Sequence, residues 1–155
     1  LRFTDPSQVH ITLKFLGETN TAILSDLRDE LAHAVEQSDV DPFTAEIGGV
    51  GVFPHLDYIS VVWAGVRNGS DELTRLHEAI ESRTTAMGFD PEEHEFTPHA
   101  TLARMEHAGG KEVVQEVVSN RDPDIGTIHV EEIRLTKSEL TTDGPEYSTL
   151  ASFEL

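Results

Sequence analysis

Strict alternation of apolar and polar residues predicts a β-strand over residues 8–16. Its apolar face is formed by Val9, Ile11, Leu13 and Phe15. Its polar face carries His10, Thr12 and Lys14. A second strand is predicted over residues 96–104, where His99 and Thr101 share one face. Each strand therefore presents a histidine and a threonine on one side and offers its other side to a core.

Apolar residues at helical spacing predict three helices elsewhere in the chain. The first follows the capping residues 19–21 and ends near residues 39–42. The second runs from Ser70, a suitable N-terminal cap, to Gly88, which suits a helix end. A short third helix is predicted over residues 111–118.

The remaining periodic stretches predict further strands. Residues 43–47 alternate and are followed by a break or bulge at residues 48–51, while residues 58–66 form a nearly unbroken apolar strand. Residues 125–140 predict one or two strands, and residues 147–153 predict the returning strand of a hairpin.

The order strand, helix, strand, strand occurs twice, from residue 10 to 66 and again from 99 to 153. This repetition predicts two related halves with a pseudo-twofold relation. No change of composition separates the halves, and 155 residues are enough for one domain with a core. We therefore expect a single two-lobed domain over residues 1–155.

The charge balance is strongly acidic, with 29 acidic and 11 basic residues and a formal net charge of −18. Together with the strong apolar periodicity, this favours a folded protein from a salt-rich cytoplasm, typical of a halophilic archaeon, over a disordered acidic tail. The alternative is an ordinary acidic enzyme. Unfolding in low and in molar KCl separates them, because only a halophilic protein is expected to lose stability in low salt.

Composition also excludes several classes of protein. The chain has no cysteine, which excludes disulfides and thiolate chemistry and is compatible with a cytoplasmic location. No run of 18 apolar residues is present, so no membrane span is expected. The few lysines and arginines argue against a broad surface that coats nucleic acid, although a small site for one phosphate is still allowed.

The two tetrapeptides His10-Ile11-Thr12-Leu13 and His99-Ala100-Thr101-Leu102 predict a paired acid and base site. If the two strands face each other across a groove, one imidazole can take a proton from water while the other gives a proton to a leaving oxygen. The reactive nitrogens would then lie roughly 5–8 Å apart around a phosphorus atom. The threonine hydroxyls can donate to non-bridging oxygens, and no metal or other cofactor is required. A single His-x-Thr is usually an ordinary surface histidine, but two copies favour the site.

A lysine, an arginine and several aromatic residues are further candidates for this site. Lys14 shares the face of His10 and is expected to bind substrate, whereas strict alternation puts Arg104 on the face opposite His99 unless the strand bulges. Phe53 is an aromatic suited to stacking a base, while Phe15 and Trp63 are expected in the core. The other histidines lack the spacing of metal ligands, so no metal site is expected; they are His33, His55, His77, His94, His107 and His129.

Five stretches carry a resemblance to a known family. Residues 10–18 (HITLKFLGE) and 98–104 (PHATLAR) resemble the two motifs of the 2H phosphoesterases, and residues 48–54, 62–66 and 138–140 match as well. Within that superfamily the chain is most similar to the RNA 2′,3′-cyclic phosphodiesterases, formerly called 2′-5′ RNA ligases. The resemblance implies a bilobal α+β fold with two pseudo-symmetric antiparallel sheets, helices outside and a central cleft. Family members usually begin with a further strand and helix, which this chain is expected to lack.

The resemblance also implies an activity. It is the metal-independent hydrolysis of a terminal RNA 2′,3′-cyclic phosphate to a 2′-phosphomonoester, with His10 as proton donor and His99 as proton acceptor. Thr12 and Thr101 are implied to bind the phosphate, and Arg104 fits the end of the second motif. The expected partner is an RNA 3′ end or a small nucleotide, with no membrane and no protein partner implied. The alternatives are an enzyme for small cyclic nucleotides, one that joins 2′-5′ RNA ends, and a nucleotide- or RNA-binding module without turnover.

Overall fold

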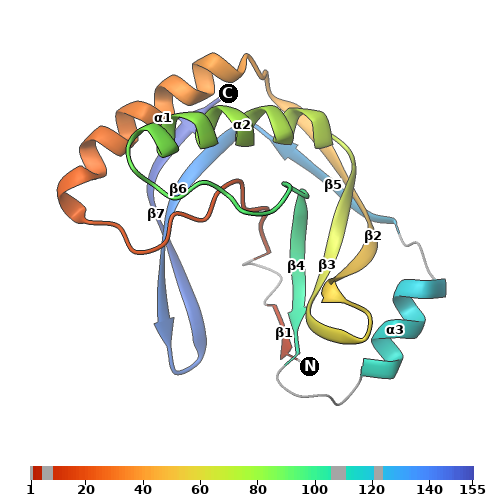
Figure 1. Cartoon of the computed structure of the whole chain (residues 1–155). Helices are drawn as coiled ribbons and strands as arrows, with labels where there is room; N and C mark the ends of the chain where they lie inside the picture. Colours follow the sequence, from red (N-terminus) through yellow and green to blue (C-terminus); the bar gives the residue numbers. More distant parts are fainter. Residues whose placement is uncertain (1, 5–8, 106–110, 121–123) are drawn as a thin grey trace. The chain divides into compact units, whose positions relative to one another are not determined.

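The computed structural model of the chain describes residues 2–4, 9–105, 111–120 and 124–155 and has an α+β fold (Figure 1). In chain order its elements are β1 (Arg2–Phe3), the short helix η2 (Thr21–Ile23), α1 (Leu24–Ser38), β2 (Phe43–His55), β3 (Tyr58–Asn68), α2 (Ser70–Ala86), β4 (His99–Arg104), α3 (Lys111–Asn120), β5 (Asp124–Val130), β6 (Glu132–Thr141) and β7 (Gly144–Glu154). These elements form two compact units, between which the chain passes repeatedly. No helix of the described residues has the length and apolar composition to cross a membrane.

The first unit comprises Leu1–Thr12, Thr44–Asp71 and Thr97–Ile128. It contains a five-stranded sheet with the strand order β1-β4-β3-β2-β5, in which β1, β4, β3 and β2 pair antiparallel. Its buried core joins the sheet to α3 and consists of Ile59, Val62, Ala103 and Val114. Because α3 covers this face through Val114, the opposite face of the sheet is left for other side chains.

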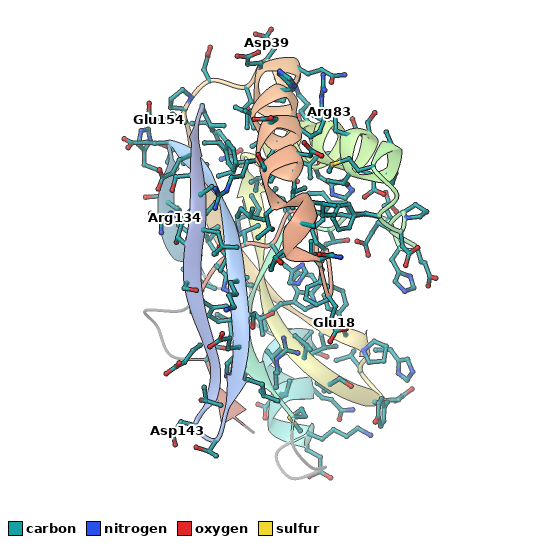
Figure 2. The ribbon with its side chains drawn as sticks, turned by 90° about the vertical axis from the view of Figure 1, so that its left-hand side faces the viewer. Glu18, Asp39, Arg83, Arg134, Asp143 and Glu154 are labelled. Carbon is teal, nitrogen blue, oxygen red and sulfur yellow. The ribbon has the colours of Figure 1, made fainter. Side chains whose placement is uncertain are left out.

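The second unit comprises Leu13–Phe43, Glu72–Phe96 and His129–Leu155. The β6–β7 hairpin pairs antiparallel, and Figure 2 shows Asp143 at its tip. Its buried apolar residues come from α1, α2 and β6 and the loop after α1, and they are Leu27, Leu31, Ala34, Val35, Val40, Leu76, Ala79, Ile80, Ile133 and Leu135. Apolar stripes of two helices thus pack on the base of the hairpin.

The helix predictions are confirmed, because the predicted apolar stripes supply the buried residues of α1 and α2. The expected break at residues 48–51 is a bulge in a continuous strand β2. The register shifts between Gly48 and Val50, and Gly49 has φ 76°, a conformation that favours glycine. The predicted stretch 125–140 forms two strands, β5 and β6.

The two expected sheets are both present, with five and two strands among the described residues. Two other expectations are wrong. Residues 9–16 form no regular strand, and only Ile11 joins the sheet, through an isolated bridge to Ala100. In this stretch the carbonyl oxygen of Leu13 accepts a hydrogen bond from the His77 side chain of α2 and not from a neighbouring strand. Phe15 is 78% exposed and does not belong to a core.

Candidate active site

The two His-x-Thr motifs meet at one point of the first unit, the antiparallel bridge between Ile11 and Ala100. In an antiparallel pair the residues on either side of a bridge lie opposite each other and point to the same face. Extended from this bridge, the antiparallel register places His10 opposite Thr101 and Thr12 opposite His99. The two motifs therefore run antiparallel to each other, with the bridge at the second residue of each.

The register also gives the approximate distance between the two histidines. In this register His10 and His99 take diagonal positions, which in an antiparallel ladder are about 7–8 Å apart. That separation lets two imidazoles reach oxygens on one phosphorus atom. The structure corrects the expected arrangement in one respect, because the motifs lie side by side in one unit and do not face each other across a groove.

The local hydrogen bond of His99 defines which of its nitrogens can accept a proton. Nδ1 lies 2.7 Å from the carbonyl oxygen of Thr97. A carbonyl oxygen only accepts, so Nδ1 carries a hydrogen and donates it. In the neutral imidazole the lone pair is then on Nε2, which suits His99 to the role of a base.

Two aromatic rings enclose the imidazole of His99. The Phe53 ring stands edge-on to it with centroids 5.0 Å apart, and the Trp63 ring lies at 5.9 Å. Phe53 and Trp63 also contact each other at 5.1 Å. Trp63 Nε1 is buried and has no hydrogen-bond partner among the described residues, so packing alone holds the indole.

Sequence reasoning missed Trp63, which it expected in the core. The indole lies over Gly51 on the neighbouring strand, where a Cβ atom would overlap the six-membered ring. Alternation along β3 could have revealed the position of Trp63. Its neighbours Val62 and Ala64 are buried, so Trp63 points to the opposite face of the sheet. In a nearly all-apolar strand this alternation cannot be read from the sequence, because both faces carry apolar residues.

Arg104 lies on the same face of the sheet as Thr101 because β4 bulges. Thr101 pairs with Trp63 and Ala103 with Val62, so Leu102 is an extra residue between them. The bulge turns Ala103 into the core and Arg104 back to the side of Thr101. The exposed guanidinium is thus a local positive charge on the face that carries the two motifs.

Lys14 is not brought to this face by any observed contact. Its ammonium donates to Glu81 at 2.9 Å and to the carbonyl oxygen of Asp90 at 2.7 Å, and the side chain is only 3% exposed. All three residues belong to the second unit. The ammonium is therefore committed to an ion pair within that unit.

The ion pair shifts the titration of Glu81. Burial raises the pKa of this carboxyl, but hydrogen bonds from Lys14 and from the Glu92 amide, with the charge of Lys14, lower it more. The net effect is a pKa below the ordinary 4.5. A carboxyl with a lowered pKa stabilises the fold above its ordinary pKa and loses this effect as the pH falls through the lowered value.

Glu81→Gln is therefore expected to lower the free energy of unfolding by about 1–3 kcal/mol at neutral pH, since Lys14 loses its counter-charge. The difference from wild type is expected to shrink as the pH falls below 4.5. Urea unfolding of both proteins across this pH range measures it. A difference that stays constant down to about pH 3 would contradict the assignment.

Comparison with known proteins adds to this geometry. A sequence profile of the family described as the 2′-5′ RNA ligase superfamily matches residues 4–142. The chain is 36% identical to a protein of Aeropyrum pernix named RNA 2′,3′-cyclic phosphodiesterase, over 97% of this chain and 84% of that protein. A protein of Methanothermobacter thermautotrophicus with the same name is 31% identical over 100% of this chain and 83% of its own length.

Solved structures show a similar fold. A crystal structure of a Thermus thermophilus protein superposes with a TM-score of 0.80 at 28% identity, over 99% of this chain and 81% of that one. The Escherichia coli LigT complexed with 3′-AMP superposes with a TM-score of 0.75 at 24% identity, over 99% and 80% of the two chains.

Proposed function

Since the chain belongs to the 2′-5′ RNA ligase superfamily, we propose that it hydrolyses the 2′,3′-cyclic phosphate at an RNA end to a 2′-phosphomonoester. The observation that carries the proposal is the register about the Ile11–Ala100 bridge. It supplies two imidazoles and two hydroxyls on one face, at a spacing that suits a single phosphate group.

In the proposed reaction the histidines have opposite roles. His99 Nε2 takes a proton from a water molecule, whose oxygen forms a bond to phosphorus. The bond from phosphorus to the 3′ oxygen breaks, and His10 gives its proton to that leaving oxygen. The phosphate stays on the 2′ oxygen, and exchange with solvent restores both imidazoles. The Thr97 hydrogen bond occupies Nδ1 and leaves Nε2 as the nitrogen of His99 that exchanges the proton.

Charge on the phosphate is held by three side chains in this proposal. Thr12 and Thr101 donate hydrogen bonds to the non-bridging oxygens, and Arg104 adds a positive charge. Their placement on the face of the two motifs supports these roles. Proton transfer and charge stabilisation are then both supplied by side chains, so we propose that the reaction needs no metal ion.

The acidic surface limits how RNA is bound. With a net charge of −18, the protein repels a polyanion such as RNA. At high salt, screening confines this repulsion to distances of a few ångströms. We therefore propose that the enzyme recognises the terminal nucleotide and its cyclic phosphate locally, with Arg104 as a cation on that face.

The test offers an oligonucleotide with a 2′,3′-cyclic phosphate end to the protein in molar KCl with EDTA. Phosphorus NMR of the products is expected to show conversion to the 2′-phosphomonoester. A cyclic mononucleotide offered in parallel shows whether a small substrate suffices. Tight binding without product would identify a binding module, and a 3′-phosphate product would contradict the proposed bond cleavage.

A further inference from the structure

The buried imidazole of His77 contacts two segments that lead directly into the two motifs. Its Nδ1 donates a hydrogen bond to the carbonyl oxygen of Leu13 at 2.7 Å. Its ring stacks on Phe96 with centroids 4.2 Å apart and planes inclined by 5°. Leu13 directly follows Thr12, and Phe96 directly precedes Thr97.

The spacing along the chain is the same on both sides. His10 lies three residues before Leu13, and His99 lies three residues after Phe96. A shift of either contact is therefore transmitted to a histidine through a very short piece of backbone. Phe96 also adjoins Thr97, whose carbonyl oxygen fixes the ring of His99.

The position of His77 in α2 favours a specific role over simple packing. It is only 7% exposed and occupies the buried stripe of the helix together with Leu73, Leu76, Ala79, Ile80 and Thr84. An apolar residue would fill this position without burying polar nitrogens. The imidazole instead combines a donor for Leu13 with a flat face for Phe96, which no aliphatic side chain provides.

A second contact from the next turn of α2 strengthens the first. Glu81 lies four residues after His77, on the same side of the helix, and binds the ammonium of Lys14. Its other oxygen accepts a hydrogen bond from the Glu92 amide at 2.9 Å. Two successive turns of α2 therefore hold residues 13 and 14, immediately after the first motif.

We propose that His77 is a positioning residue, which sets the segments that carry His10 and His99 through its contacts with Leu13 and Phe96. This inference rests on the proposed function, because only a reaction that needs both imidazoles depends on their mutual placement. Small displacements of reacting groups are costly, about 10²-fold in rate for a shift of 1 Å.

Three variants separate the two contacts of His77. His77→Leu removes both, His77→Phe keeps the stacking ring, and His77→Asn keeps a donor near the position of Nδ1. Thr84→Ala is the matched control, because Thr84 is fully buried in the same helix and its hydroxyl donates to the carbonyl oxygens of Ile80 and Glu81 in that helix. All proteins are assayed at a temperature at which circular dichroism shows them folded.

The leucine variant is expected to lower kcat by about 10- to 100-fold with little change in KM, and the Phe and Asn variants by less. Thr84→Ala is expected to lower the melting temperature but to keep kcat. A leucine variant whose kcat stays within about threefold of the control, or one that changes KM alone, would overturn the inference.

Histidine-selective NMR supplies a readout that needs no turnover. The ring signals of both His10 and His99 are expected to shift in His77→Leu and to stay in place in Thr84→Ala. Unchanged ring signals in the leucine variant would overturn the positioning role. A wild type without turnover would overturn the proposed function instead, and the NMR comparison would still decide the role of His77.

Discussion

His99→Ala and His10→Ala are each expected to lower kcat on a cyclic-phosphate RNA end by about 10²–10⁴-fold, the usual contribution of a general base or acid. The reason is the shared register at the Ile11–Ala100 bridge, which in the proposed reaction puts each histidine at one oxygen of the same phosphate. Steady-state kinetics with a cyclic-phosphate oligonucleotide measures the loss. KM is expected to change little, because the threonines and Arg104 remain.

The control for this loss is His33→Ala, since His33 is exposed on α1 in the other unit. It is expected to leave kcat unchanged. Both histidines are proposed to act in the same chemical step. The double variant His10→Ala with His99→Ala is therefore expected to have a kcat close to that of the slower single variant. Losses that multiply in the double variant would show that the two histidines act independently.

Gly51→Ala is expected to give the second large effect, through the Trp63 ring. A Cβ atom at Gly51 overlaps the six-membered ring of the Trp63 indole, so the ring must shift. Overpacking of this kind costs about 1–3 kcal/mol of stability. The displaced ring also moves against His99, so kcat is expected to fall by about 10- to 100-fold. Urea unfolding and kinetics measure the two effects.

A second-site change makes this prediction specific. Trp63→Phe removes the part of the indole that overlaps the new Cβ, so Gly51→Ala with Trp63→Phe is expected to be more stable and more active than Gly51→Ala alone. Gly51 is not in the left-handed region, so its backbone accepts alanine. If the double variant is no better than the single one, the overlap with Trp63 is not the cause.

Periodic helices were predictable from the sequence because burial repeats over several turns. The stripe of α2, for example, keeps a consistent spacing from Leu73 to Thr84. The alternation over residues 8–16 led to a wrong prediction of a regular strand. Alternation shows that a segment has an apolar and a polar face, but it does not show whether a neighbouring strand pairs with it. Lys14 shows the consequence, since its expected place beside His10 assumed a regular strand.

The motif residues of the site were also predictable, but their surroundings were not. His10 and His99 stood out as a repeated pattern, whereas their adjacency depends on strand order. The face of Arg104 depends on a one-residue bulge at Leu102, which alternation alone does not reveal. The contacts of His77 were not predictable, because its partners Leu13 and Phe96 are distant from it in the sequence.

The paired acid and base are tested most directly by the pH dependence of kcat/KM for wild type, His99→Ala and His10→Ala on one cyclic-phosphate oligonucleotide. Wild type is expected to give a bell-shaped profile, with a rising limb from the base and a falling limb from the acid. Loss of His99 is expected to remove the rising limb, and loss of His10 the falling one. Either variant retaining both limbs would show that water and leaving oxygen exchange protons with other groups.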